Sequence, residues 1–195
     1  MPKRKIHTVE ELFEIYPEAK EIFVDATERP IQRPKNDKKQ RKFYSGKKKR
    51  HSKKSTIITN NKRQILYLGS TVEGKKHDYN AFKEEFPETT PPPQLLKGFS
   101  LYTDLGYLGI EKAFPWLNIK IPKKRPKRKE LTSEEKLENR RINSIRVKVE
   151  HAICGVKRFA IVSGIFRNRK ESIDDKAMEV VCGLWNYHLS YANQI

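Results

Sequence analysis

The sequence predicts an α/β protein with a mixed central sheet and flanking helices. Short runs rich in β-branched and aromatic residues are typical of strands. One long segment with apolar residues at helical spacing predicts an amphipathic helix, and a second such segment closes the chain. The strand-like runs are residues 19–24, 55–59, 64–70, 99–103 and 118–121. A chain of 195 residues is long enough for one medium-sized domain.

The long helix is predicted to begin after Leu131 and to continue past Glu150. Glu134 and Glu135 suit its first turn, because the helix dipole favours acidic side chains there. One arc of this helix is apolar and contains Ile142, Ile145, Val149, Ala152, Val156 and Ala160. Arg146, Glu150 and Lys157 share a narrower arc, about a quarter-turn away. Glu150 is thus a lone carboxylate between two cations. It is either a surface residue whose charge is balanced by its neighbours for solubility or part of a functional site.

Three shorter or later helices are also expected. The first follows Thr8, which we expect to be its N-cap, and the second covers residues 80–86. The last begins after Ser172, and we expect it to pack against the sheet. Its predicted apolar stripe contains Ala177, Val180, Val181, Leu184, Trp185 and His188. We expect His188 to be a core histidine.

Two aspartates follow strand-like runs. The runs at 55–59 and 64–70 flank a turn-forming segment and predict a hairpin. Pairing this hairpin with 19–24 would make a three-stranded antiparallel sheet. Asp25 is expected at the exit of the first strand, and Asp104 directly follows the run at 99–103.

The charge of the chain points to nucleic acid. The formal net charge is +18, with 42 Lys and Arg against 24 Asp and Glu. Such an excess favours a polyanionic partner over an anionic membrane surface or plain solubility. Residues 38–54 and 123–129 are dense in cations, and segments of this kind are either disordered or bound to a polyanion. No run approaches the roughly 20 apolar residues of a membrane helix, and no secretory signal is evident, so a cytoplasmic, nucleoid-associated protein is expected. Cys154 and Cys182 are expected to be buried thiols.

Asp25, Asp104 and Glu150 are candidates for a metal site. Carboxylates suit Mg²⁺ or Mn²⁺ better than histidine or thiolate does. A pair of such ions can activate an attacking oxygen and stabilise a leaving oxygen during phosphoryl transfer. Because the three residues are far apart in the sequence, only a fold that brings two strand ends beside a helix can assemble them.

Four ordered motifs carry a family resemblance. They lie at residues 24–34, 44–51, 103–109 and 146–150. Together they resemble the catalytic domain of bacterial insertion-sequence transposases of the DDE superfamily, close to the Harbinger-like group. The resemblance implies an RNase H-like fold in which Asp25, Asp104 and Glu150 are the catalytic, metal-binding triad for Mg²⁺ or Mn²⁺.

The same resemblance places DNA-binding residues on the long helix. Arg146 and Lys157 match positions that hold DNA phosphates near the metals in related transposases. Asn143 departs from the pattern, because related transposases carry tyrosine there. The full set of expected DNA-binding residues is Arg29, Lys47, Lys48, Lys49, Arg50, Arg146 and Lys157.

The resemblance implies a Mg²⁺-dependent enzyme that cleaves double-stranded DNA at insertion-sequence ends and joins the freed 3′ ends to target DNA. Two alternatives remain open, namely a catalytically inactive or domesticated DNA-binding remnant and a nuclease that cuts without joining. His77 and Asp78 are expected in a polar turn, with an approach to the metals as the alternative.

About twenty residues precede the first predicted strand. We expect residues 1–20 to be a basic tip and short helix, and 21–195 to be the catalytic domain. Related transposases carry an N-terminal helical DNA-recognition region, so a second reading frame joined by frameshifting, or a decayed copy, is expected. The pairing of two DNA ends makes a homodimer an expectation by analogy.

Overall fold

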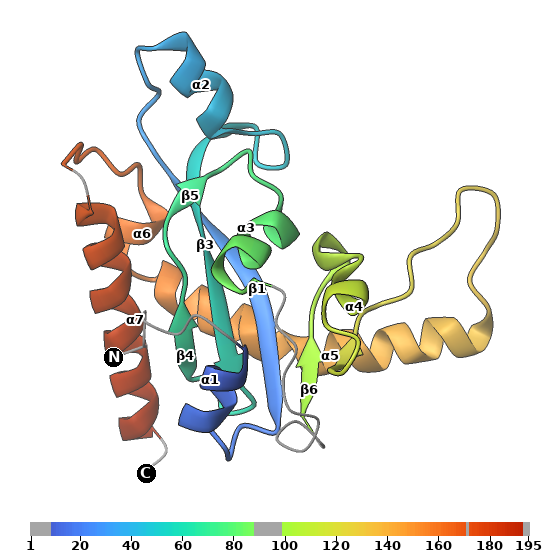
Figure 1. The fold of residues 1–195 in the computed structure, drawn as a ribbon. Coiled ribbons are helices and arrows are strands. Elements are labelled where there is room, and N and C mark those ends of the chain that lie inside the picture. Colours follow the sequence, from blue (N-terminus) through green and yellow to red (C-terminus); the bar gives the residue numbers. More distant parts are fainter. Residues whose placement is uncertain (1–8, 88–98, 171, 193–195) are drawn as a thin grey trace.

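The computed structural model describes residues 9–87, 99–170 and 172–192 and has a three-layered α/β architecture (Figure 1). In chain order the elements are α1 (Val9–Ile15), β1 (Glu21–Pro30), α2 (Asp37–Phe43), β2 (Tyr44–Ser45), β3 (Arg50–Asn60), β4 (Ile65–Leu68), β5 (Val72–Glu73), α3 (Asp78–Glu85), β6 (Ser100–Tyr102), η1 (Leu105–Tyr107), α4 (Ile110–Ala113), β7 (Asn118–Lys120), α5 (Ser133–Lys157), α6 (Ala160–Ser163) and α7 (Ile173–Ala192). No helix within the described ranges is long and apolar enough to cross a bilayer.

The sheet is mixed, as predicted, with β1 near its centre. Its path runs β2-β3-β1-β6-β7, and both β4 and β5 pair with β3. β1 is antiparallel to β3 and parallel to β6, which is parallel to β7. The predicted hairpin is confirmed as β3 and β4, and with β1 it forms the expected antiparallel set. This mixed sheet with flanking helices is compatible with the expected RNase H-like fold.

β1 is longer than predicted, and the expectation that Asp25 lies at its exit is wrong. The strand continues to Pro30, because β3 pairs with it from Asn60 back to Ser52. Asp25 therefore lies in the middle of β1, opposite Ile57. The same pairing orders part of the basic run at 38–54, since β3 begins at Arg50.

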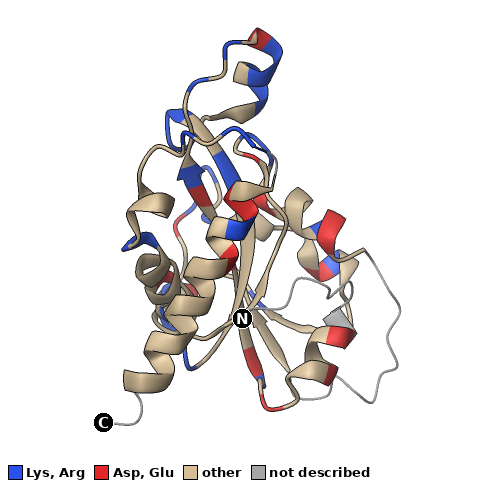
Figure 2. Ribbon diagram, turned by 90° about the vertical axis from the view of Figure 1, so that its left-hand side faces the viewer, with Lys and Arg blue, Asp and Glu red and all other residues tan. Residues whose placement is uncertain are grey.

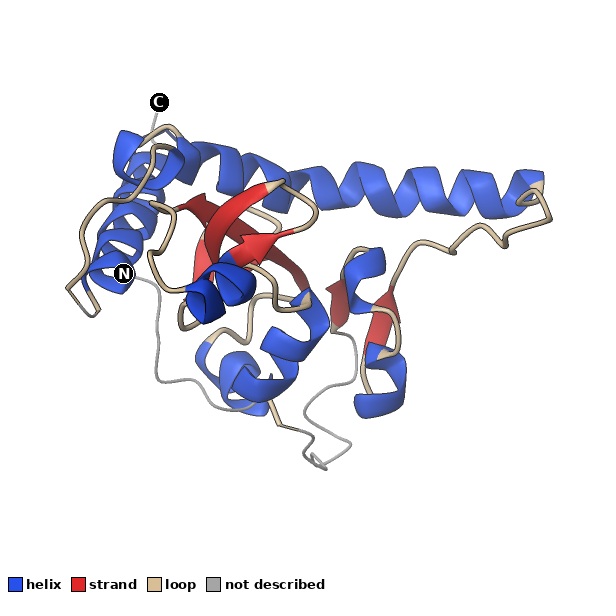
Figure 3. Cartoon of the chain, turned by 90° about the horizontal axis from the view of Figure 1, so that it is seen from above, coloured by secondary structure: helices blue, strands red, loops and turns tan. Residues whose placement is uncertain are grey.

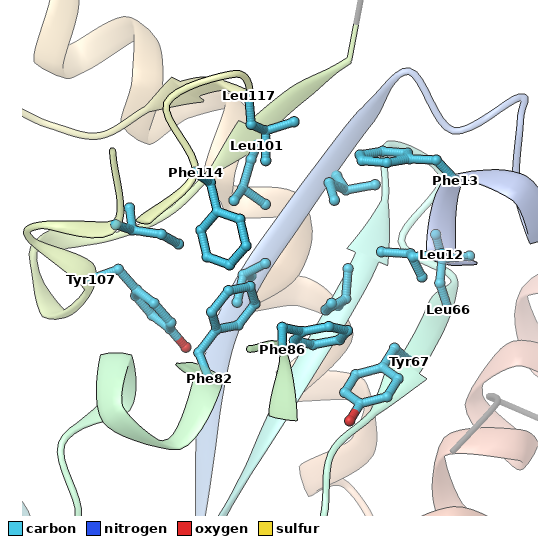
Figure 4. Close-up of a cluster of buried hydrophobic side chains, with 14 of the residues drawn as sticks. Leu12, Phe13, Leu66, Tyr67, Phe82, Phe86, Leu101, Tyr107, Phe114 and Leu117 are labelled. Atoms are coloured by element: carbon cyan, nitrogen blue, oxygen red, sulfur yellow. The ribbon is translucent and has the colours of Figure 1, made fainter. Parts of the chain in front are cut away.

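Two apolar cores lie on opposite faces of the sheet. Figure 3 shows helices on both sides of the sheet. α1, α3 and α4 cover one face, where Leu12, Phe13, Phe82, Phe86 and Phe114 are buried (Figure 4). α5 and α7 cover the other face together with the short α6. Thr8, the predicted N-cap of the first helix, lies outside the described residues. The sheet is thus covered on both faces, and polar groups between the layers must find partners inside the fold.

α5 confirms the predicted helix start. Thr132 is its N-cap, and a capping box forms in which Thr132 accepts from the Glu135 backbone N–H and the Glu135 side chain accepts from that of Thr132. Ile142, Val149, Ala152 and Val156 are buried, as the apolar arc predicted. The helix therefore presents a fixed face to the sheet.

The predicted face of α7 is partly wrong. Val180, Leu184 and His188 are exposed, and the buried apolar side chains are Met178, Val181, Cys182, Trp185 and Leu189. α7 lies at the side of the sheet and packs on α5 and β4, so only a narrow stripe of it is covered. Cys154 is exposed, against expectation, because it lies beside the buried stripe of α5.

Close packing joins α5 to α7 at Gly155. A Cβ at this position would lie 2.2 Å from Cε3 of Trp185. The indole is held in place because its Nε1 donates to the Arg63 carbonyl oxygen at 2.9 Å. Asn186 also fixes α7 to β4 by hydrogen bonds of 2.8 Å in both directions with the Ile65 backbone.

Gly155→Ala should destabilise the fold by about 1–3 kcal/mol, even though alanine normally favours a helix over glycine by about 1 kcal/mol. The added methyl group displaces the Trp185 ring. Chemical denaturation of the single variants and of the double variant with Trp185→Leu measures the coupling. The cost of Gly155→Ala should shrink in the Trp185→Leu background. An equal cost in both backgrounds would show that this contact does not limit the packing.

Glu85, near the end of α3, carries a carboxyl group that points into the fold. A Cβ at Gly69 would lie 2.2 Å from Glu85 Oε1, so glycine makes the space for this side chain. Burial raises the pKa of Glu85 to about 7, and the Thr56 and Tyr67 hydroxyls offset this only in part. The folded state therefore holds a proton that the unfolded chain releases near its ordinary pKa of 4.5.

The pKa of Glu85 predicts a pH-dependent loss of stability. Because the pKa is raised in the folded state, the free energy of unfolding should fall as the pH rises from about 4.5 to about 7. Glu85→Gln should remove this component and be more stable than wild type at pH 8 by about 1–3 kcal/mol. Glu84→Gln is the control, since Glu84 is exposed and pairs on the surface with Lys76. Denaturation curves with the same pH dependence in wild type and Glu85→Gln would contradict the assignment.

Candidate active site

A cavity of about 350 Å³ brings most of the predicted site residues together. It is lined by Asp25 from β1, Asp104 from the turn after β6, and Arg146, Glu150 and Lys157 from α5. The predicted DNA-binding residues Lys47 and Lys48 line it as well, as do two acidic residues outside the predicted set, Glu28 and Asp78. The carboxylates and the cations of the prediction thus share one concave site.

The parallel pairing of β1 with β6 places the two aspartates. Phe23 is opposite Tyr102, so the same register continued for two residues brings Asp25 opposite Asp104. Asp104 is the N-cap of η1, and its Oδ1 accepts from the Gly106 N–H at 2.8 Å. A Cβ on Gly106 would lie 2.8 Å from this oxygen and 3.1 Å from Asp78 Oδ2. Gly106 therefore allows both carboxylates to approach the backbone of the turn.

α5 supplies the third side of the cavity. Arg146 is 6% exposed, and its guanidinium lies 4.0 Å from Asp25 Oδ2. Its Nε has no hydrogen-bond partner among the described residues. Glu150 follows one helical turn later and is exposed, and Lys157 is two turns further on. The helix thus presents a buried cation, an exposed carboxylate and a half-buried cation to the same cavity.

The site holds its charges at an electrostatic cost. Burial and, to a smaller extent, the charge of Asp104 raise the pKa of Asp25 to about 6, against the opposing effects of the Ala26 N–H and Arg146. Burial also lowers the pKa of Lys157, and the positive charge of Lys48 contributes to this lowering. A cation placed among the carboxylates, or an anion beside the two lysines, would relieve these costs.

The chemistry of the donor set fits a hard divalent cation. Asp25, Asp104 and Glu150 offer only carboxylate oxygens, which Mg²⁺ and Mn²⁺ prefer. Burial and the neighbouring charge of Asp104 raise the pKa of Asp25, and a divalent cation bound there would oppose both effects. Among the described residues, no three acidic, histidine or cysteine side chains lie close enough to hold a metal ion. The cavity therefore contains suitable ligands, but these side chains lie farther apart than the ligands of a bound ion would.

Asp78 is a fourth carboxylate at the site, and its partner is a buried lysine. Lys54 Nζ donates to Asp78 Oδ1 at 2.6 Å and to the Lys76 carbonyl oxygen at 2.7 Å, and lies 3.8 Å from Glu28 Oε1. Glu28 also accepts from the Ser45 and Ser52 hydroxyls. Asp78 thus belongs to the site rather than to a simple polar turn.

The sequence held a signal for this network. Lys54 is the direct partner of Glu28 in the β1–β3 register. A strand pattern that covers residues 50–60 would have placed Lys54 inside the sheet, whereas the prediction assigned it to a basic run that is either disordered or bound to a polyanion. The position of His77 at the N-cap of α3 then brings Asp78 to it.

The remaining predicted DNA-binding residues lie outside the cavity. Arg29 is 2% exposed, donates to Thr71 Oγ1 at 2.6 Å and lies 4.0 Å from Asp174. Its burial corrects the expectation that it contacts DNA, because its role is to hold α7 to the sheet. Lys49 and Arg50 are exposed at the β2–β3 turn, among the Lys and Arg residues that gather at that end of the molecule (Figure 2).

Comparison with known proteins agrees with this geometry. The family model described as DDE superfamily endonuclease matches residues 24–186. The chain is 35% identical over 170 residues to a protein of Microchaete diplosiphon named probable transposase for insertion sequence element IS702. The alignment covers 87% of this chain and 57% of that protein, so the chain spans little more than half the length of this relative. No solved structure matches the chain.

The match includes every residue that lines the acidic cavity, from Asp25 to Lys157. It confirms the family expected from the four motifs. The chain belongs to the DDE superfamily of endonucleases.

Proposed function

We propose that this chain is the catalytic part of a transposase that cleaves DNA at insertion-sequence ends and joins the freed ends to target DNA. The observation that carries the proposal is the cavity that Asp25, Asp104 and Glu150 share with Arg146 and Lys157. The similarity to a probable insertion-sequence transposase supports the choice of DNA as the substrate.

The three carboxylates are the proposed ligands of Mg²⁺ or Mn²⁺. A divalent cation bound there supplies Lewis-acid polarisation of a phosphodiester and lowers the pKa of a bound water. Asp25 and Asp104 are held by the sheet, whereas Glu150 is exposed on α5. Binding of one cation by all three carboxylates would therefore depend on the side chain of Glu150 reaching from α5 toward the two aspartates.

The cations of the cavity are proposed to hold the DNA backbone. Arg146 lies inside the cavity beside Asp25, and Lys48 lies near enough to Lys157 for its charge to help lower the pKa of Lys157, which burial lowers most. A phosphate between the two lysines would remove their mutual repulsion. In the reaction, a water oxygen attacks phosphorus and the bond to the 3′ oxygen breaks. The freed 3′-hydroxyl oxygen then bonds to a phosphorus of the target while the bond from that phosphorus to the target's own 3′ oxygen breaks, and the proton lost by the attacking hydroxyl balances the 3′-hydroxyl that leaves.

Asp25→Asn, Asp104→Asn and Glu150→Gln should each lower the rate of DNA strand cleavage by about a hundredfold or more, because each removes a charge that holds the cation. Glu134→Gln is the matched control, since Glu134 is exposed in the first turn of the same helix, outside the cavity. Cleavage of labelled duplexes carrying insertion-sequence ends, with Mg²⁺ or Mn²⁺, gives the rates. A variant that keeps its rate is not a triad member. If wild type binds DNA but cleaves none, the chain is a DNA-binding remnant.

Lys54→Met should lower the free energy of unfolding by about 3–5 kcal/mol, because Asp78 and Glu28 would keep buried charges without their cation. Lys76→Met is the control, because Lys76 pairs with the exposed Glu84 and such surface pairs contribute about 0–1 kcal/mol. The double variant Lys54→Met with Asp78→Asn should recover part of the loss. Urea denaturation measures all four proteins. Equal losses for the two lysine variants would contradict the proposed network.

A further inference from the structure

A second cleft, outside the acidic cavity, lies where the chain leaves β1. Its volume is about 400 Å³, within the range of roughly 300 to 1,000 Å³ that is typical of ligand sites. One wall is formed by residues 31–36, and the other by residues 166–169 between α6 and α7. α2 contributes Lys39 and Phe43. The cleft and the acidic cavity have no lining residue in common.

Backbone hydrogen bonds join the two walls. The Phe166 N–H donates to the Pro30 carbonyl oxygen at 2.9 Å, and the Gln32 N–H donates to the Phe166 carbonyl oxygen at 3.4 Å. Asn36 caps α2 by accepting from the Lys39 N–H at 3.0 Å. The cleft is therefore built by the ordered backbone of three segments and not by side chains alone.

The cleft is strongly basic. Its lining includes Arg33, Lys35, Lys39, Lys53, Arg167 and Arg169, and no acidic residue is among the described residues that line it. Lys53 is neutralised by Asp174 at 2.7 Å. Lys35, Lys39 and Arg167 are exposed and have no ion pair within the described part of the chain. These three cations are available to an anionic ligand.

Two aromatic rings complete the cleft. Phe43 and Phe166 both line it and are half-buried, so part of each ring remains accessible. Unpaired cations beside accessible aromatic rings are the combination that binds single-stranded nucleic acid, because cations hold the phosphates and rings stack on unpaired bases. A duplex offers its phosphates but keeps its bases stacked internally.

The cleft lies along β1 from the proposed catalytic cavity. Asp25 lines the cavity and Ile31 lines the cleft, and six residues of a strand span about 20 Å. The rise of one DNA strand is about 3.4 Å per nucleotide, so the same distance corresponds to about six nucleotides. A DNA strand cut at the cavity can reach the cleft.

We propose that this cleft binds an unpaired segment of the DNA strand that flanks the cleavage site, with phosphates on Lys35, Lys39 and Arg167 and a base against Phe43 or Phe166. The choice of DNA rests on the proposed function. The cleft adds a contact that duplex binding at the acidic cavity does not provide. It gives the protein a preference for DNA ends with a single-stranded tail.

The test compares the affinity for a blunt duplex with that for the same duplex carrying a single-stranded tail. Fluorescence anisotropy with labelled oligonucleotides in EDTA measures both without cleavage. Wild type should bind the tailed duplex about fivefold or more tightly. The triple variant Lys35→Ala, Lys39→Ala, Arg167→Ala should abolish this preference and reduce the salt dependence of tailed-duplex binding by about two counterions, at roughly 0.7 per phosphate of a single strand. Phe166→Leu should weaken the preference, because leucine keeps the apolar contact but cannot stack.

A matched control removes the same charge elsewhere. Lys124, Lys127 and Arg128 are exposed in the loop before α5 and lie outside both the cleft and the cavity. Their triple alanine variant should lower both affinities alike and keep the preference for the tail. Loss of the preference in this control, no preference in wild type, or tighter binding of a single-stranded RNA tail would overturn the proposal. Because EDTA prevents metal-dependent cleavage, a failed cleavage assay would count against the proposed function alone.

Discussion

The parallel pairing between β1 and β6 determines where acidic side chains come together in this protein. The pairing brings Asp25 beside Asp104, although 78 residues separate them in the chain. Burial of Asp25 and repulsion from the Asp104 carboxylate, in the turn after β6, both raise the pKa of Asp25. Such an arrangement is unfavourable for stability alone and is expected where the charges have a chemical task. α5 then closes the site by placing Arg146 beside Asp25.

The surrounding network compensates for these charges in two different ways. Inside the fold, Lys54 is surrounded by Asp78, Glu28 and the Lys76 carbonyl oxygen, so its charge is matched within the protein. At the rim, Lys48 and Lys157 both line the cavity, and burial lowers the pKa of Lys157, to which the charge of Lys48 also contributes. The buried cation thus serves the structure, whereas the rim cations are proposed to bind an external anion. Arg29 is also a cation that serves the structure, because its guanidinium donates to Thr71 and lies beside Asp174.

Much of this arrangement could be predicted from the sequence where local signals were sufficient. The Thr132 cap, the buried arc of α5, the β3–β4 hairpin and the position of Asp104 after β6 follow from capping, periodicity and turn chemistry. Features set by long-range pairing could not be predicted in the same way. β1 continues past Asp25 only because β3 pairs with it, and that pairing also buries Arg29 and Lys54, which looked like surface cations. The covered face of α7 depends on how far the helix overlaps α5 and β4, which periodicity does not specify.

The proposed chemistry requires that the carboxylates of the cavity bind a divalent cation. Calorimetric titration of Mn²⁺ into the wild-type chain and into Asp104→Asn, with DNA both present and absent, measures this binding. We expect saturable binding to wild type that is lost or greatly weakened in Asp104→Asn. We also expect uptake of the ion to release protons near pH 6, because Asp25 is partly protonated there. Identical titrations of the two proteins, with DNA as well as without it, would show that the carboxylates form no cation site and leave only a basic protein that binds DNA by charge.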